Sequence, residues 1–209
     1  TVVGVGRDPK TLARAVELGA IDSFATDLAA GVEGAGLVVV CTPVDRIAET
    51  ILAAAPHVRP GALFTDAGST KAGIAAAVGG RLPPGVEFVP AHPLAGAEKN
   101  GVEHARADLF AQRTTVVTPL RNETAVDRVA AFWRALGSRV IHMPAADHDR
   151  VLAVTSHLPH AAAAAVAGVT PVGCLPFTAG GFRDVTRIAA GDPGLWAAIF
   201  TENRDAVLA

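Results

Sequence analysis

Three short stretches of the chain place proton-handling or anion-binding side chains beside glycine or proline. They are His92-Pro93-Leu94-Ala95-Gly96, Ser156-His157-Leu158-Pro159-His160 and Gly180-Gly181-Phe182-Arg183-Asp184-Val185-Thr186-Arg187-Ile188-Ala189. Burial of such polar groups costs free energy unless they are paired or take part in chemistry, and the rest of the sequence is rich in alanine and valine. The three stretches therefore predict one shared site that moves a proton and binds an anion.

A metal is not needed to explain these residues. His157 and His160 are three residues apart, a spacing that puts both on nearly one face of a helix. No Cys, Asp or Glu in the same segment completes a ligand set. Cys41 and Cys174 match no metal-binding or redox spacing, so we expect two free thiols and no metal site.

Composition limits the partners of the chain. Its 209 residues are 50% hydrophobic and 18% charged, with a formal net charge of -2. This balance gives no electrostatic reason to bind nucleic acid or an anionic membrane surface. No apolar run approaches the roughly 18 residues that a membrane span needs, and no signal peptide precedes the first expected strand. We therefore expect a cytoplasmic protein that acts on a small molecule.

The elements that would position these residues alternate through residues 1–144. Apolar β-branched runs predict strands, and the stretches between them have helical spacing. The expected strands are 1–5, 21–24, 37–41, 62–66, 86–91, 114–118 and 139–141, and the expected helices are 9–18, 44–55, 71–78 and 124–136. This alternation predicts a Rossmann-like, doubly wound parallel α/β sheet.

The pattern changes after Pro144, and residues 145–209 predict a smaller, all-helical domain. We expect a long helix over 145–169 interrupted at Pro159, then helices over 184–190 and 193–208, with Asp192 as the cap of the last. Alanine on this scale permits close helix packing, so a homodimer through this domain is expected.

A dinucleotide site is expected in residues 1–144, but its fingerprint is incomplete. Gly4-Val5-Gly6 is followed by Arg7 and Asp8, and no Gly-x-Gly-x-x-Gly occurs. We interpret Thr1–Val5 as the second strand of the domain, which leaves the first strand and its glycine loop missing. Gly6 and Arg7 would then lie beside the adenosine ribose, where a basic residue favours NADP over NAD.

Five motifs in register over the whole chain resemble the prephenate/arogenate dehydrogenase family. They are Asp66-Ala67-Gly68-Ser69-Thr70-Lys71, His92 to Glu98, Thr155 to His160, Gly181 to Ala189, and Asp192-Pro193 with Trp196 and Glu202-Asn203. The resemblance implies NAD- or NADP-dependent oxidative decarboxylation of prephenate to 4-hydroxyphenylpyruvate, or of arogenate to tyrosine, in tyrosine biosynthesis.

The resemblance also implies roles for individual residues. His92 would be the base that takes the proton of the ring hydroxyl, and Ser69 would orient it or cap the helix that follows Lys71. Arg187 would bind the ring carboxylate. The expected substrate-binding residues are Ser156, His160, Arg187, His157, Asp184 and Glu98; the expected cofactor-binding residues are Gly6, Arg7, Thr42, Pro43 and Ser69.

Other interpretations remain open. Another dehydrogenase with a Rossmann domain and helices, such as a β-hydroxyacid dehydrogenase, would share the architecture, although such families usually place a catalytic lysine on the long helix. A binding protein or inactive fragment that keeps the pocket, and a helical scaffold, are further alternatives. Because the glycine loop is missing, we expect the 209-residue chain alone to have little activity.

Overall fold

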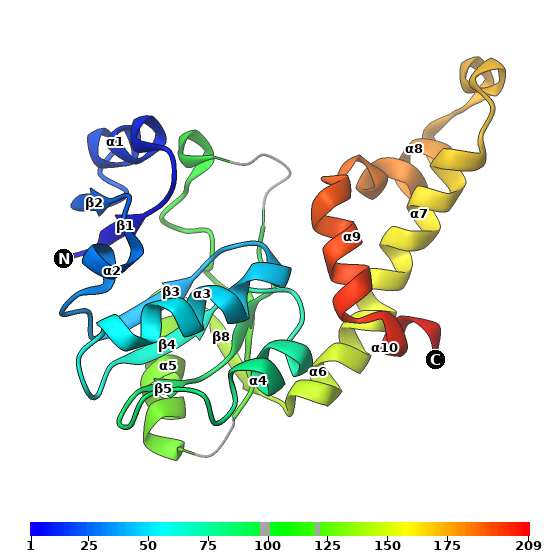
Figure 1. The fold of residues 1–209 in the computed structure, drawn as a ribbon. Coiled ribbons are helices and arrows are strands. Elements are labelled where there is room, and N and C mark those ends of the chain that lie inside the picture. Colours follow the sequence, from blue (N-terminus) through cyan, green and yellow to red (C-terminus); the bar gives the residue numbers. More distant parts are fainter. Residues whose placement is uncertain (97–100, 120–121) are drawn as a thin grey trace.

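The computed structural model describes residues 1–96, 101–119 and 122–209. Within these ranges the strands lie between Val3 and His142, and the chain from Ala145 onward is helical. Figure 1 shows the strand-containing part and the helical part side by side, with α6 (Ala145–Leu152) leading from one to the other. The expected fold, a Rossmann-like α/β part followed by smaller helices, is confirmed.

The described strands form three small sheets. β1 pairs with β2, and β3, β4 and β5 form a second sheet, all of them parallel. In the third sheet β7 is antiparallel to β6 and parallel to β8. The bounds are β1 Val3–Val5, β2 Ser23–Ala25, β3 Leu37–Val40, β4 Leu63–Asp66, β5 Glu87–Phe88, β6 Ala91–Pro93, β7 Thr114–Val117 and β8 Arg139–His142.

The strand expected over residues 86–91 is divided at Pro90. Val89 N still donates to Phe64 O at 2.9 Å, so up to this point the chain follows β4. Pro90 has no N–H to continue that ladder, and its carbonyl accepts from Thr118 N at 2.9 Å instead. The chain thus changes partner from β4 to β7, and the new strand β6 carries His92.

The first two strands are set apart from the second sheet. Among the described strands, β1 bonds only to β2, and β3 bonds only to β4. In a doubly wound sheet of order 3-2-1-4-5 the first strand separates the second from the fourth. The pairing of β1 fits its interpretation as a second strand. Val3 and Val5 are 45% and 40% exposed, although parallel strands are normally covered on both faces.

Helices pack on the sheets around two buried clusters. In the first, α2, α3 and α4 contact β3 to β5; in the second, α5 places Trp133 against β4, β6 and β7. Ile199 of α9 (Pro193–Glu202) is buried in the first cluster, so the helical part shares this core. The other bounds are α1 Pro9–Glu17, α2 Leu28–Val32, α3 Ile47–Ala54, α4 Ala72–Val78 and α5 Glu123–Ala135, of which α2 was not expected.

The long helix is interrupted before Pro159 rather than at it. α6 continues through a π-helical turn (Ala153–His157) into α7 (Leu158–Val169), and Leu158 N donates to Ala153 O, five residues back. Pro159 lacks the N–H for an ordinary helical bond, and its ring would crowd the carbonyl of Thr155. The wider turn supplies the room, so the helix does not end there.

The last helices follow a series of turns. α8 (Gly180–Thr186) leads through a 3-10 turn (Arg187–Ala190) to α9, whose cap Asp192 accepts from Leu195 N at 2.7 Å, as expected. The helix expected over 193–208 breaks at Asn203, and α10 follows (Arg204–Leu208). The remaining 3-10 turns are Val44–Arg46, Ala55–His57, Val102–His104 and Val172–Phe177.

The expectation that no apolar run approaches the length of a membrane span is wrong. Residues Ala145–Val169 form a helix of 25 residues whose most apolar window has a mean hydropathy of 1.3, enough by length and composition to cross a membrane. The reason is that Pro159 does not end the helix and that its second half is mostly alanine. The first turns are nevertheless packed, since His148 and Asp149 are buried against the strand-containing part.

Candidate active site

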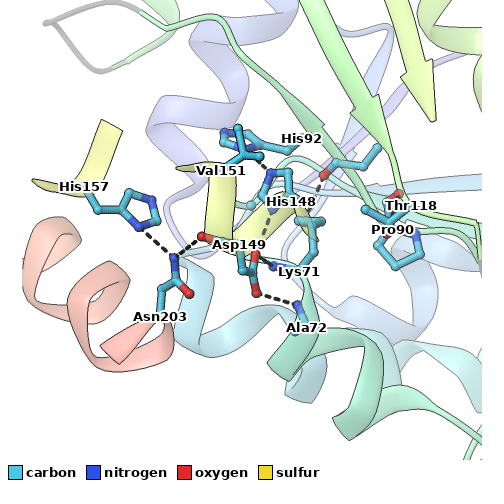
Figure 2. Close-up of polar contacts among 12 residues, drawn as sticks. Lys71, Ala72, Pro90, His92, Thr118, His148, Asp149, Val151, His157 and Asn203 are labelled. Atoms are coloured by element: carbon cyan, nitrogen blue, oxygen red, sulfur yellow. Dashed lines mark hydrogen bonds and ion pairs between the residues drawn. The ribbon is translucent and has the colours of Figure 1, made fainter. Parts of the chain in front are cut away.

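His92 is joined to two residues at the start of the long helix. Its ring is half-buried on β6, and its Nδ1 lies 2.9 Å from His148 Nε2. The other ring nitrogen of His148, Nδ1, lies 2.7 Å from Asp149 Oδ1. Figure 2 shows the three side chains in sequence, from the strand to α6. A histidine in such a chain is oriented by its neighbours and can accept a proton at its remaining nitrogen.

Asp149 also caps α4 from outside its own helix. Its Oδ1 accepts from Lys71 N and its Oδ2 from Ala72 N, both at 2.8 Å (Figure 2). The amides at a buried helix start need such acceptors. Burial alone would raise the pKa of Asp149, but the bonds from His148 and from the two amides lower it below the usual value, so the carboxylate is ionised.

This cap corrects the expectation for Ser69. The N-cap position of α4 is Lys71, and the helix start is bonded by Asp149, 78 residues along the chain, rather than by Ser69. The side chain bonded to His92 is His148. The expected role of Ser69 in orienting His92 near the nicotinamide stays a prediction. Ser69 is half-buried in a neighbouring cleft.

A buried ion pair fixes the backbone next to His92. Lys71 Nζ bonds to Asp66 Oδ2, and both side chains are fully buried. Lys71 Nζ also donates to Ala91 O at 2.9 Å, and Asp66 Oδ1 accepts from Ala91 N at 3.0 Å. Both backbone groups of Ala91 are therefore held by this pair, which ties β6 to the end of β4.

The surroundings keep His92 neutral. Burial is the largest cause that lowers the pKa of His92 well below its usual value, followed by the positive charge of Lys71 and by His148 and His157. Burial lowers the pKa of Lys71 as well, against the attraction of Asp66. A neutral imidazole has a free lone pair, which is the form that a general base requires.

The histidine pair of the long helix is divided between two environments. His157 is buried, and its Nδ1 lies 3.0 Å from Asn203 Nδ2, which also donates to Asp149 O at 2.8 Å (Figure 2). His160 stacks on Trp196 with ring centroids 3.6 Å apart, and its Nδ1 lies 2.9 Å from Ser156 O. Within the described residues no group of three metal-binding side chains is found.

Three of the expected cofactor residues come together. Thr42, Pro43 and Ser69 line a cleft of about 690 Å³ at the carboxyl ends of β3 and β4, closed on one side by the start of α9. Ligands of doubly wound sheets bind at this edge. The lining combines the hydroxyl groups of Thr42 and Ser69 with the apolar side chains of Pro43 and Leu195.

Gly6 and Arg7, two further residues expected to bind the cofactor, directly follow the carboxyl end of β1. Arg7 is exposed, whereas the carboxylate of Asp8 is occupied: it accepts from Lys10 N at 3.0 Å and from Thr11 Oγ1, and so caps α1. These contacts lower the pKa of Asp8.

The remaining expected substrate residues lie in the helical part or outside the described residues. Ser156 is half-buried in the π-helical turn. Asp184 on α8 and Arg187 in the turn after it are exposed. Glu98 falls outside the described residues.

Sequence reasoning missed four residues of this network: Lys71 as a buried cation, His148, Asp149 and Asn203. The available signal was the polar Asp147-His148-Asp149-Arg150 at the start of an otherwise apolar helix. The bonds of Lys71 N to Asp149, of His148 to His92 and of Asn203 to His157 span 46 to 78 residues, so no local pattern shows that these four residues belong to one network.

Two family models match this chain, one over its strand-containing part and one over its helical part. A family model for the prephenate dehydrogenase nucleotide-binding domain matches residues 1–142, and one for the prephenate dehydrogenase dimerization domain matches residues 144–209.

Individual relatives agree with the family models. The chain is 37% identical to cyclohexadienyl dehydrogenase of Zymomonas mobilis, over 94% of this chain and 69% of that protein. It is 33% identical to prephenate dehydrogenase of Bacillus subtilis, over 99% of this chain and 58% of that protein. The structure of prephenate dehydrogenase from A. aeolicus in complex with hydroxyphenyl propionate and NAD+ superimposes with a TM-score of 0.86 at 31% identity, over 99% of this chain and 74% of that one. The chain belongs to the prephenate dehydrogenase family.

Proposed function

We propose that this chain carries the catalytic base and the substrate-binding residues of an enzyme that oxidatively decarboxylates prephenate to 4-hydroxyphenylpyruvate in the cytoplasm, with arogenate as the alternative substrate. The observation that carries the proposal is the position of His92: its ring lies half-buried on β6 with Nδ1 2.9 Å from His148 Nε2, and burial and the charge of Lys71 lower its pKa. The chain spans 69% and 58% of the two curated relatives, so the proposal concerns the full-length protein.

In the proposed reaction His92 takes the proton of the substrate's ring hydroxyl at Nε2. The bound nicotinamide supplies the hydride acceptor for the carbon that carries this hydroxyl. The bond to the ring carboxylate then breaks and CO2 leaves, while the electron pair of that bond completes the aromatic ring and moves onto the former hydroxyl oxygen. That oxygen takes the proton back from His92, which gives the phenol of the product and restores the neutral imidazole. The protein need not supply an electron sink, so its task is positioning and proton transfer.

Arg187 is proposed to hold the ring carboxylate, because a guanidinium can bond both oxygens of a carboxylate at once. Ser156 and His160 are proposed to contact the substrate's side chain, and Asp184 and Glu98 to lie near it. His157 is proposed to act through the framework, since it is buried and bonded to Asn203.

The cofactor is proposed to be NADP, on the basis of Arg7. A basic side chain at the end of the second strand accommodates a 2′-phosphate, and the nearby acid, Asp8, is engaged as a helix cap. Thr42, Pro43 and Ser69 would line the nicotinamide half.

The helical part is proposed to form a homodimer. Val154, Leu158, Val166 and Val169 are exposed along the π-helical turn and α7, and burying such residues favours association. This agrees with the dimerization domain matched over residues 144–209. We propose a domain boundary at residues 144–145, where α6 begins.

A β-hydroxyacid-type dehydrogenase is less well supported. Such enzymes usually place a catalytic lysine on the long helix, and residues 145–169 contain no lysine.

The experiment is a comparison of initial rates for the full-length protein and its His92→Asn variant, with prephenate and arogenate, each with NAD and NADP. We expect His92→Asn to lower turnover by about two or more orders of magnitude, the usual contribution of a positioned base. Unchanged turnover in this variant would refute the role of His92. No cofactor binding in isothermal titration would refute the enzyme function.

A further inference from the structure

The contacts of Asp149 determine where the protons of the two neighbouring imidazoles lie. Asp149 is ionised and can only accept hydrogen bonds. It takes three: from Lys71 N, from Ala72 N and from His148 Nδ1. The proton of a neutral His148 must therefore sit on Nδ1, which leaves its Nε2 as an acceptor.

The tautomer of His148 in turn fixes that of His92. His148 Nε2 accepts, so the proton of neutral His92 must sit on Nδ1, 2.9 Å away. His92 Nε2 is then left with a bare lone pair. Among the described residues no hydrogen-bond partner is found for that atom.

We propose that His148 is a positioning residue that, together with Asp149, holds His92 in the one neutral tautomer whose Nε2 can act as a base. The inference deepens the proposed function and rests on it. In the opposite tautomer Nε2 carries the proton, so His92 cannot accept one there, and Nδ1 faces the lone pair of His148 with no proton between them.

The arrangement also serves the state after proton transfer. When Nε2 has taken a proton, His92 becomes an imidazolium whose Nδ1–H donates to His148, and a hydrogen bond with an ionised donor is stronger than a neutral one. The charged groups around His92 are Lys71 before α4, Asp66 at the end of β4 and Asp149 on α6, with His157 in the π-helical turn. Of these, Asp149 is connected to His92 through the imidazole of His148, which is hydrogen-bonded to both.

Two substitutions of His148 distinguish the contribution of its hydrogen-bond acceptor from that of its volume. His148→Phe fills the buried space but removes the acceptor, and His148→Gln keeps an amide oxygen that can reach the Nδ1–H of His92. A conformation that leaves a buried donor without an acceptor is less populated by a factor of roughly 5 to 150. We expect kcat/KM of the full-length protein to fall by about 10- to 100-fold in His148→Phe, with KM nearly unchanged, and to recover to within about fivefold of the unsubstituted protein in His148→Gln.

His142→Phe is the matched control, because His142 is an exposed histidine at the end of β8. We expect it to leave kcat/KM unchanged. Equal losses in His148→Phe and His148→Gln would assign His148 a purely structural role and overturn the inference.

Histidine side-chain 15N spectra test the tautomer without any turnover. In the full-length protein we expect a pyrrole-type signal for His92 Nδ1 and a pyridine-type signal for Nε2, identified by their loss in His92→Asn. The reverse pattern would overturn the inference. If the expected pattern is seen but neither prephenate nor arogenate is turned over, the proposed function fails while the tautomer assignment stands.

Discussion

The buried Lys71–Asp66 pair offers the sharpest test of how the site is held. Lys71→Met keeps the aliphatic length of the side chain but removes the ammonium group. Asp66 is then left fully buried as an uncompensated charge, and Ala91 O loses a hydrogen bond. Breaking such a pair by removing one partner costs about 3–5 kcal/mol. For a chain of 150–250 residues this corresponds to a fall in Tm of roughly 6–20 °C.

The double variant Asp66→Asn/Lys71→Met separates charge from packing. It leaves no buried charge, and the asparagine oxygen can still accept from Ala91 N or Gly68 N, as Asp66 does. We expect it to cost less than Lys71→Met alone, by about 0.5–3 kcal/mol, because the interaction energy between contacting residues falls in this range.

The assay is thermal and urea unfolding of the full-length protein, followed by circular dichroism. Lys10→Met is the matched control, since Lys10 is exposed on α1, and we expect it to stay within about 0.5 kcal/mol of the unsubstituted protein. A loss below about 1 kcal/mol for Lys71→Met, or a double variant no more stable than the single one, would refute the argument that a buried charge pair holds β6.

The remaining predictions concern the site and one helix end. Because burial and Lys71 depress the pKa of His92, kcat/KM should stay level as the pH falls through about 6.5, the ordinary histidine value, and decline only below it; a pH–rate profile with its acid limb at or above that value would contradict this. Arg187→Ala should raise KM for the substrate with a smaller effect on kcat, measured by steady-state kinetics, and an unchanged KM would remove Arg187 from the carboxylate site. Asp192→Ala removes the cap of α9 and should cost about 1 kcal/mol by urea unfolding, whereas Asp205→Ala on exposed α10 should change little; equal effects would argue against the cap.

The elements of the fold were largely predictable because their patterns are local. The strand over Leu63–Asp66 and the helix over Glu123–Ala135 follow from apolar runs and helical spacing, and the Asp192 cap from its place before Pro193. The predictions that proved wrong concern features that depend on residues elsewhere in the chain. Pro90 cannot continue the bonds to β4 because it has no N–H, but no local rule shows that its carbonyl is bonded by Thr118, just after β7, so that a new strand begins there.

The candidate site divides in the same way. His92 is predictable because a histidine beside a proline is conspicuous in an apolar sequence. The prediction that Ser69 orients His92 rests on the family resemblance alone. The residue bonded to His92 is 56 positions away, in a polar stretch at the start of the long helix whose sequence does not indicate which strand it contacts. Proximity of that kind exists only after the long helix has folded back onto the strands.

Asn203 and Asp149 have a consequence for how the molecule comes apart. Asp149 binds the start of α4 through its side chain, while its carbonyl is bound by Asn203 from the end of α9, whose Ile199 lies in the core of the strand-containing part. If the helical part unfolds, the amides at the start of α4 lose their acceptor, Asp149. If the strand-containing part unfolds, the Asp149 carboxylate loses these donors. Although two separate family models cover the chain, both regions should denature in one cooperative step, without a stable half-folded species.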